Sequence, residues 1–269
     1  MASASPAEDD MPEDDVPSDS EEDGPEFTAA RVLPVREAIE LLAEGSLEIE
    51  GRLTSASNAT LYCGVSLAGV SAACVYKPIA GERPLWDFPD GTLAWREVAA
   101  YEVSAATGWR VVPPTVLRDG PAGPGMVQLW IDEDEDVDLV RLLRDHDNEQ
   151  LRRIAVFDAI INNTDRKGGH VLPTSDGHIY GIDHGVSFHV DDKLRTVLWQ
   201  WSGERIPDAT LECLALLGER LRGDLGELLG DLLTRAEVRR TIRRVDALLS
   251  VGLHPLPSSD WPPVPYPPM

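Results

Sequence analysis

The sequence predicts an α+β fold of two lobes, with a small antiparallel sheet in the first half and a mainly helical second half. Short segments of alternating apolar residues, typical of strands, recur between residues 47 and 131. Apolar residues at helical spacing then occupy most of residues 137–249. At 269 residues with 42% hydrophobic content, the chain is long enough to bury a core of this size.

The first half is expected to begin with a helix over residues 35–44, which ends before Gly45. A second helix is predicted over residues 91–108, where GTLAWREVAAYEVSAATG has good helix formers and a terminal glycine. Strands surround these helices. They are expected at residues 47–53, 59–67, 72–78, 111–117 and 125–131.

The second half follows an acidic linker at residues 132–138. Helices are expected at 137–145 and 148–163 and in Leu-rich segments between 211 and 249, with a short strand at 178–182. The proline-rich end should be extended and should fold back on the domain or serve as a ligand for another protein. The predicted division is an acidic tail (1–27), an N-lobe (28–131), a helical C-lobe (132–253) and a proline-rich tail (254–269).

Charge is unevenly distributed along the chain. Basic residues number 24 and acidic residues 47, a net charge of −23, and residues 1–26 hold eleven acids and no basic residue. Such a segment buries too little apolar surface to fold, so we expect a disordered tail that solubilises the protein or binds a protein partner. The acidic balance disfavours nucleic acid and anionic membrane surfaces as partners.

Other function classes are also disfavoured by the sequence. No apolar run approaches the roughly 20 residues of a transmembrane helix, and the N-terminus lacks a secretory signal pattern. We therefore expect a soluble, cytoplasmic protein without a transmembrane segment. The three cysteines, Cys63, Cys74 and Cys213, lack C-x-x-C spacing, which argues against a disulfide framework or a zinc site.

The stretch AIINNTDRKGGHVLPTSDGHIYGIDHG, residues 159–185, carries the clearest chemical pattern. Asp165 precedes His170 by five residues, and Asp183 lies in an I-D-H-G turn. ATP-dependent phosphotransferases place a base aspartate and a metal-binding asparagine at D-x-x-x-x-N, followed by a metal-chelating aspartate in D-F-G. The pattern therefore predicts Asp165 as the base for the acceptor hydroxyl, with Asp183 and His170 as metal ligands.

Basic residues that could meet the nucleotide phosphates lie in both halves. Lys77, on the third expected strand, is placed to offset phosphate charge, and Glu97 on the following helix could hold its ammonium group. Glu102 is the rival partner on that helix. Arg166 could neutralise the transferred phosphate, but a structural ion pair is an equally good interpretation.

The nucleotide itself needs a phosphate cover and an adenine site. The polar loop with Ser55, Ser57 and Asn58 could bring backbone N–H groups and hydroxyls to the phosphates, although it is not a G-x-x-x-x-G-K-S/T loop. Gln128, Leu129 and Trp130 lie on a strand that should join the lobes. This strand is the best candidate for backbone contacts to adenine.

The motifs VYKP, WREVAAYE, MVQLWI, NNTDRKGGH and YGIDHG, spread over roughly residues 45–205, together resemble one known group of proteins. The chain is similar to the actinobacterial branch of the phosphatidylinositol 3- and 4-kinase-related proteins, atypical kinases that also include the HipA toxin kinases. The resemblance implies a two-lobed protein-kinase-like fold, ATP and a divalent metal. It leaves the acceptor open, and the charge balance favours a protein or small molecule over a lipid.

His170 departs from the kinase pattern. Imidazole nitrogen suits Mg²⁺ less than an asparagine oxygen does, and Mn²⁺ tolerates it better. Two functions therefore stand: an active kinase that uses Mg²⁺ or Mn²⁺, and a nucleotide-binding pseudokinase that acts as an interaction scaffold.

Overall fold

The computed structural model describes residues 33–53 and 58–269. Residues Val32–Met269 form one compact unit. The acidic tail and the loop residues Ser55 and Ser57 lie outside the described residues, so the expectations for them stay predictions.

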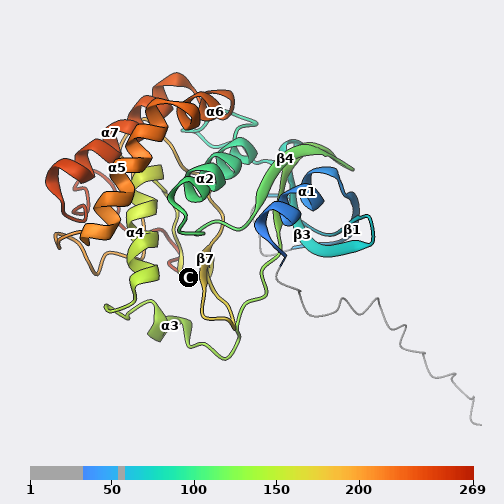
Figure 1. Ribbon diagram of the computed structural model, residues 1–269, viewed down its shortest axis with the longest axis horizontal. Helices are drawn as coiled ribbons and strands as arrows, with labels where there is room; N and C mark the ends of the chain where they lie inside the picture. The colour runs from blue at the N-terminus through green and yellow to red at the C-terminus, as the bar shows by residue number, and fades with distance from the viewer. Residues whose placement is uncertain (1–32, 54–57) are drawn as a thin grey trace, which may run out of the picture. The chain divides into compact units, whose positions relative to one another are not determined.

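A five-stranded antiparallel sheet follows the first helix, α1 (Val35–Glu44). Its strand order is β1-β2-β3-β5-β4, so the final hairpin places β5 in the sheet interior. Helix α1 lies beside this sheet (Figure 1). Leu41 and Leu42 of α1 pack on buried residues of β2, β3 and β5, which closes a small core. The strands are β1 (Ser46–Arg52), β2 (Leu61–Leu67), β3 (Val70–Pro78), β4 (Thr115–Gly120) and β5 (Gly123–Leu129).

Helix α2 (Leu93–Thr107) belongs to both halves of the molecule. Near its N-terminus Ala94 and Val98 pack with Met126 of β5, whereas residues 99–103 join the core of the helical half. Gly108, at φ 70°, ends the helix in the left-handed conformation that glycine adopts without steric cost. The position of this helix is therefore fixed from two sides.

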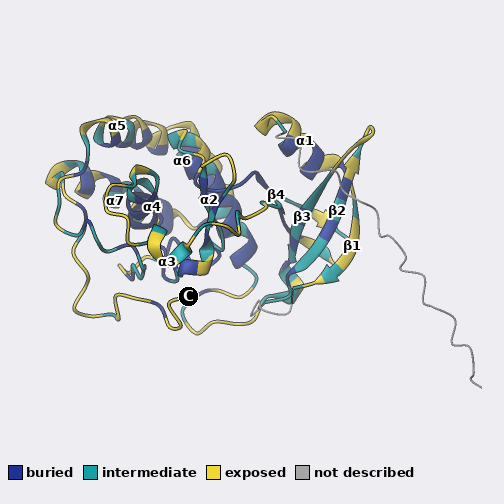
Figure 2. Cartoon of the chain, turned by 90° about the horizontal axis from the view of Figure 1, so that it is seen from below, coloured by how far each residue is buried: buried dark blue, intermediate teal, exposed yellow. Residues whose placement is uncertain are grey.

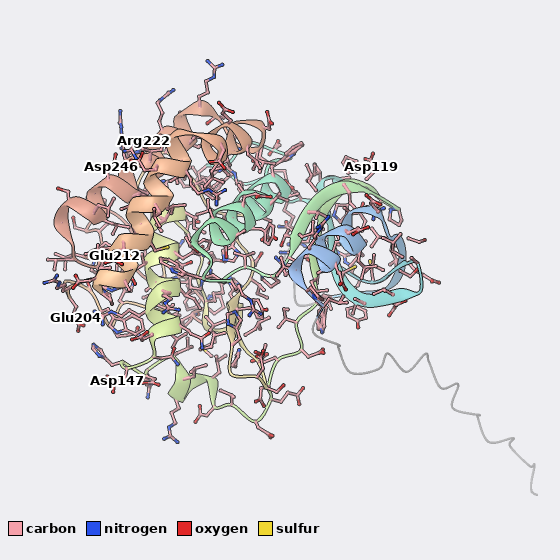
Figure 3. All side chains as sticks on the ribbon, viewed as in Figure 1. Asp119, Asp147, Glu204, Glu212, Arg222 and Asp246 are labelled. Carbon is pink, nitrogen blue, oxygen red and sulfur yellow. The ribbon has the colours of Figure 1, made fainter. Side chains whose placement is uncertain are left out.

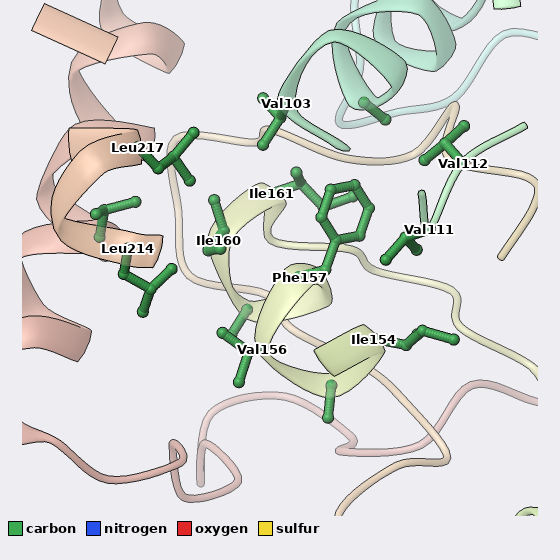
Figure 4. Packing of buried hydrophobic residues seen from close by; sticks show 14 of the residues in the cluster. Val103, Val111, Val112, Ile154, Val156, Phe157, Ile160, Ile161, Leu214 and Leu217 are labelled. Atoms are coloured by element: carbon green, nitrogen blue, oxygen red, sulfur yellow. The ribbon is translucent and has the colours of Figure 1, made fainter. Parts of the chain in front are cut away.

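The helical half surrounds α4 (Glu149–Ile161), whose apolar side chains Ile154, Phe157 and Ile160 are buried against neighbouring elements (Figure 4). Figure 2 shows that burial concentrates on the inward sides of these helices. Among the described residues, none of the helices has both the length and the apolar character needed to span a bilayer. The remaining elements are α3 (Leu139–Leu142), α5 (Asp208–Arg222), α6 (Asp224–Leu232), α7 (Arg235–Val251), β6 (Val171–Pro173) and β7 (Ile179–Gly181).

The predicted α+β fold and the order of its main elements are confirmed. Three details differ from the sequence prediction. Strand β4 begins only at Thr115, because two prolines precede it and proline cannot donate to a strand ladder. Helix α3 spans four residues rather than nine, and the pairing of β6 with β7 was not anticipated.

The proline-rich end packs back onto the domain rather than extending away from it. The N–H group of Thr196 and the indole N–H of Trp199 both donate to the carbonyl of Pro263, at 3.0 and 2.8 Å. The N–H of Gly168 donates to the carbonyl of Pro268 at 2.8 Å. These contacts use carbonyl groups, which proline retains.

A buried ion pair fastens α2 to α7. Arg96 donates to Glu237 at 2.6 Å, and the two side chains are 3% and 8% exposed. Arg96 also donates to the carbonyl of Ser187 at 2.7 Å, and Glu237 accepts from Thr234 in a capping box. Loss of either partner would leave an uncompensated charge in the interior.

We expect Arg96→Met to lower the free energy of unfolding by about 3–5 kcal/mol, because Glu237 would remain buried without its cation. Urea denaturation followed by circular dichroism measures the change. The matched control is Arg205→Met, whose ion pair with Asp208 is 74% and 73% exposed and should be worth at most about 1 kcal/mol. Equal losses in the two variants would contradict the assignment.

Candidate active site

A cavity of about 350 Å³ brings together side chains from the sheet and from the helical half. Lys77 comes from β3 and Glu97 from α2, whereas Asp165 and Asp183 come from loops that follow α4 and β7. The predicted reacting groups thus meet in one cleft. Its other lining residues are Asn58, Ala59, Pro78, Glu82, Arg83, Leu85, Trp86, Asp87, Phe88, Leu93, Ala94, Thr164, Gly185, Val186, Lys193, Arg195 and Trp261.

Lys77 bridges two carboxylates at the inner end of this cleft. Its Nζ donates to Oε1 of Glu97 at 2.7 Å and to Oδ1 of Asp183 at 2.9 Å. The Glu97 side chain is 2% exposed, the Lys77 side chain 20% and the Asp183 side chain 48%. Glu97, rather than its rival Glu102, is therefore the helix partner of Lys77.

The three groups shift one another's proton affinities. Burial lowers the pKa of Lys77, but the carboxylates of Asp183 and Glu97 outweigh this effect and hold the pKa above its ordinary value. The Lys77 ammonium in turn holds the pKa of Asp183 well below its usual range. Burial raises the pKa of Glu97, and Lys77 offsets part of that rise. Lys77 is thus a fixed positive charge, and Asp183 a fixed negative one.

The loop after α4 is organised by a fully buried ion pair between Asp158 and Arg166. Asp158 accepts from Nε and Nη2 of Arg166 and from the side-chain amide of Asn163. The Asn163 side-chain oxygen accepts the N–H of Asp165 at 3.0 Å. Asn163 therefore braces the loop, and Asp165 is held at the cleft by its own backbone.

Arg166 does not reach the cleft, and its predicted role beside the transferred phosphate is wrong. Its side chain is 0% exposed. Beyond Asp158, it donates to the carbonyls of His170 and Ile182 at 3.1 and 2.8 Å and to Nε2 of His184 at 2.6 Å. The structural ion pair, the other interpretation of the sequence, is the correct one.

The turn that carries Asp183 is held by its neighbour His184. Arg166 can only donate, so Nε2 of His184 must accept and the imidazole carries its proton on Nδ1. Burial, followed by the charge of Arg166, holds the pKa of His184 well below its usual range. The backbone N–H of His184 donates to Glu97 at 2.8 Å. Asp183 itself has φ 61°, a left-handed conformation that is costly for a residue with a Cβ and that recurs at functional sites.

His170 lies beside Asp183, with its Nε2 3.5 Å from Oδ2 of the carboxylate. Burial lowers the pKa of His170, which favours the neutral imidazole that a metal requires. The described residues contain no group of three or more His, Cys, Asp or Glu side chains poised to hold a metal. Two protein ligands fit an ion that takes its remaining ligands from phosphates and water.

The predicted adenine contacts find little support. Gln128 is buried and its amide donates to Thr115 at 2.9 Å. The backbone N–H groups of Leu129 and Trp130 donate to carbonyls within the sheet half, at Pro114 and Ala73. These two donors are therefore taken, and none of the three residues lines the cavity. Asn58 does line it, and its side-chain oxygen accepts the N–H of Arg83.

Three further cationic residues lie beside the predicted base or line the cavity. Lys167 pairs with Asp165 at 2.9 Å, and Lys193 pairs with Asp87 at the same distance. Arg195 lines the cavity. Lys167 lies two positions after the predicted base, which is a usable sequence signal. Lys193 and Arg195 lie in residues 193–201, whose place after the Asp183 turn predicts an activation or acceptor-binding segment.

We expect Lys77→Met to destabilise the protein by about 3 kcal/mol, because Glu97 would be left buried without a cation. The pKa of Glu97 would then rise further above its unfolded value, so stability should be higher at pH 5 and should fall as the pH rises through the folded pKa. Thermal unfolding at pH 5 and pH 8 checks this expectation. Asp183 remains solvated and should contribute little.

The double variant Lys77→Met/Glu97→Gln is the control for this experiment. It removes the ionisable buried group, so the pH-dependent part of the loss should disappear. A loss in Lys77→Met that is independent of pH would contradict the pairing as described.

Comparison with known proteins supports this reading of the fold. No family model matches the chain. Over 82% of this chain and 75% of the other, it superposes on the crystal structure of the Golgi casein kinase with Mn/ADP bound, with TM-score 0.54 and 14% identity. A second crystal structure of the Golgi casein kinase gives TM-score 0.52 at 14% identity, over 81% and 74% of the two chains. These similarities show a protein-kinase-like fold.

One curated protein is similar to this chain in its amino-acid sequence. The chain is 46% identical over 261 residues to Protein Rv2133c of Mycobacterium tuberculosis (strain ATCC 25618 / H37Rv), an alignment that covers 84% of this chain and 94% of that protein. Identity of this extent across most of this chain and nearly all of that protein establishes common descent. The chain therefore belongs to the family of Protein Rv2133c.

Proposed function

We propose that this chain is an ATP-dependent kinase that transfers the γ-phosphate to a hydroxyl of a protein or small molecule. One observation carries the proposal. Lys77 bridges Glu97 and Asp183 in a cleft that also contains Asp165. An ammonium for phosphates, an exposed carboxylate for a metal and a second carboxylate for the acceptor are the groups that phosphoryl transfer requires.

Each residue has a separate task in this proposal. Asp165 accepts or orients the proton of the attacking hydroxyl, and Lys167 pairs with its carboxylate at 2.9 Å. Lys77 holds the nucleotide phosphates. Glu97 keeps Lys77 in place, because a carboxylate that is 2% exposed cannot turn toward solvent.

Asp183 and His170 would hold a divalent cation, which would neutralise phosphate charge when bound. One structural neighbour, the Golgi casein kinase, was crystallised with Mn/ADP, which supports nucleotide and metal use here. A relationship to the phosphatidylinositol 3- and 4-kinase-related proteins and to the HipA kinases is also part of this proposal. A cytoplasmic location and a protein partner for either tail stay predictions.

A nucleotide-binding pseudokinase is the second candidate, and two features favour it. Asp165 is tied to Lys167, and a histidine replaces the metal-binding asparagine of the kinase pattern. Both candidates bind nucleotide, so turnover separates them.

We expect Asp165→Asn to lower phosphoryl transfer from ATP by about 10²–10⁴-fold, the range of a lost general base. Radiolabelled ATP with protein alone measures autophosphorylation and ATP turnover, and thermal stabilisation by ATP with Mg²⁺ or Mn²⁺ measures binding. Binding should persist in the variant.

Asp147→Asn is the matched control for this substitution. Asp147 is an exposed acid between α3 and α4, labelled in Figure 3, and should have no effect on turnover. Stabilisation by nucleotide without turnover in the unmodified protein would favour the pseudokinase. Absence of both would overturn the proposed function.

A metal test addresses His170. The ratio of activity with Mn²⁺ to activity with Mg²⁺ should be higher in the unmodified protein than in His170→Asn, because an amide oxygen suits Mg²⁺ better than imidazole nitrogen does. His146→Asn, which changes an exposed histidine outside the cleft, should leave the ratio unchanged. Identical metal profiles for the unmodified protein and His170→Asn would remove His170 from the metal site.

A further inference from the structure

Arg195 is held directly beside the loop that carries the predicted base. Its backbone N–H donates to the carbonyl of Asn163 at 3.0 Å, and its own carbonyl accepts from the N–H of Arg166 at 3.1 Å. Asp165 lies in the chain between Asn163 and Arg166, the two residues that make these bonds with Arg195. The Arg195 side chain lines the same cavity as Asp165.

The Arg195 guanidinium has no anionic partner among the described residues. Its side chain makes no hydrogen bond or ion pair there, and its Nε is buried without a hydrogen-bond partner. The two lysines that line the cleft differ, since Lys77 and Lys193 each lie within 2.9 Å of a carboxylate. The chain has 47 acidic and 24 basic residues, so a lack of acidic residues does not explain why Arg195 has no anionic partner there.

Burial of an unpaired donor is costly, so a partly buried arginine without a partner indicates a site for an external anion. A guanidinium presents a planar fork of N–H groups that matches the two oxygens of a carboxylate or phosphate. Its charge is permanent over the whole range of physiological pH. Arg195 therefore has the chemistry of an anion subsite.

A lysine and two tryptophans line the same cavity as Arg195. Lys193, two residues earlier, lies between the rings of Trp86 and Trp261, with its Nζ 4.7 Å from each ring centroid. We call these two tryptophans the aromatic rim. Trp86 is 83% exposed, and both rings line the cavity. The rim offers apolar contact area, while the Lys193 charge is already paired with Asp87.

The residues that contact Lys77 and Arg195 distinguish the nucleotide end of the cleft from the acceptor end. Lys77 is fixed to Asp183, the predicted metal ligand, so it belongs with the nucleotide phosphates. Arg195 is fixed through its backbone to the loop of Asp165, the group that must meet the acceptor hydroxyl.

We propose that Arg195 is an acceptor-binding residue, and that the acceptor carries a carboxylate or phosphate group close to the hydroxyl that receives the γ-phosphate. The role of Arg195 in binding an acceptor rests on the proposed kinase function. Binding of an anion by Arg195 can be tested without catalysis. The aromatic rim packs against the body of the acceptor, and Arg195 fixes its charged end.

The test uses the full chain and two probes, inorganic phosphate and malonate. Phenylglyoxal modifies accessible arginines, and mass spectrometry of peptides follows the labelling of Arg195 under four conditions: no addition, ADP with Mg²⁺, phosphate, and malonate. Saturating phosphate or malonate should slow the labelling of Arg195 by about tenfold or more, as expected for a charge-assisted contact. ADP with Mg²⁺ should leave the rate unchanged, and exposed Arg144 should label alike throughout.

Calorimetric titration of phosphate provides a second measurement. Arg195→Ala should weaken binding by about tenfold or more, and Arg195→Lys, which keeps the charge but not the fork, should give an intermediate loss. Arg144→Ala is the matched control and should bind phosphate as the unmodified protein does.

Protection by phosphate alone supports a phosphate-bearing acceptor, and protection by malonate alone supports a carboxylate-bearing one. Protection by ADP with Mg²⁺ would assign Arg195 to the donor phosphates and overturn the proposal. Failure of both anions to protect, together with unchanged phosphate affinity in Arg195→Ala, would overturn the subsite altogether. Failure of the proposed function shows separately, as absence of thermal stabilisation by ATP and metal.

Discussion

The buried ion pair between Asp158 and Arg166 is the constraint on which the candidate site depends. Both side chains are completely shielded from solvent, where two charges are costly unless every polar atom finds a partner. Here Arg166 meets that condition by donating to the carbonyls of His170 and Ile182 and to the ring of His184. One guanidinium thus connects the loop after α4 to the turn after β7.

The side chains of the candidate site are positioned by this network without taking part in it. Asp165 precedes Arg166, His170 contributes its carbonyl, and Asp183 follows Ile182. Their backbones are fixed by the buried pair, while the side chains of Asp165 and Asp183 line the cleft. This separation explains how a largely buried scaffold can present exposed carboxylates at fixed places. It also explains why an arginine inside a motif need not touch a substrate.

The sequence was most informative where one residue type allows few alternatives. The strand and helix order followed from periodicity, and Lys77, Glu97, Asp165 and Asp183 were selected by spacing that kinase chemistry imposes. For Arg166 the sequence left two interpretations open, because sequence cannot show burial, and an arginine in a cleft and one in a core have the same neighbours in the chain. The sequence indicates residues 193–201 as an activation or acceptor-binding segment but does not single out Arg195, because the place of Arg195 depends on two backbone hydrogen bonds between segments about thirty residues apart.

Glu97 and Asp183, the two carboxylates that contact Lys77, differ in exposure, and this difference separates their roles. Glu97 is 2% exposed and also accepts the N–H of His184, so it cannot leave Lys77 without losing two partners in the interior. Asp183 is 48% exposed, so water or a cation can reach its carboxylate while Lys77 still contacts one of its oxygens. In the proposed kinase, Asp183 is therefore the carboxylate that turns to a metal, while Glu97 retains Lys77 for the phosphates.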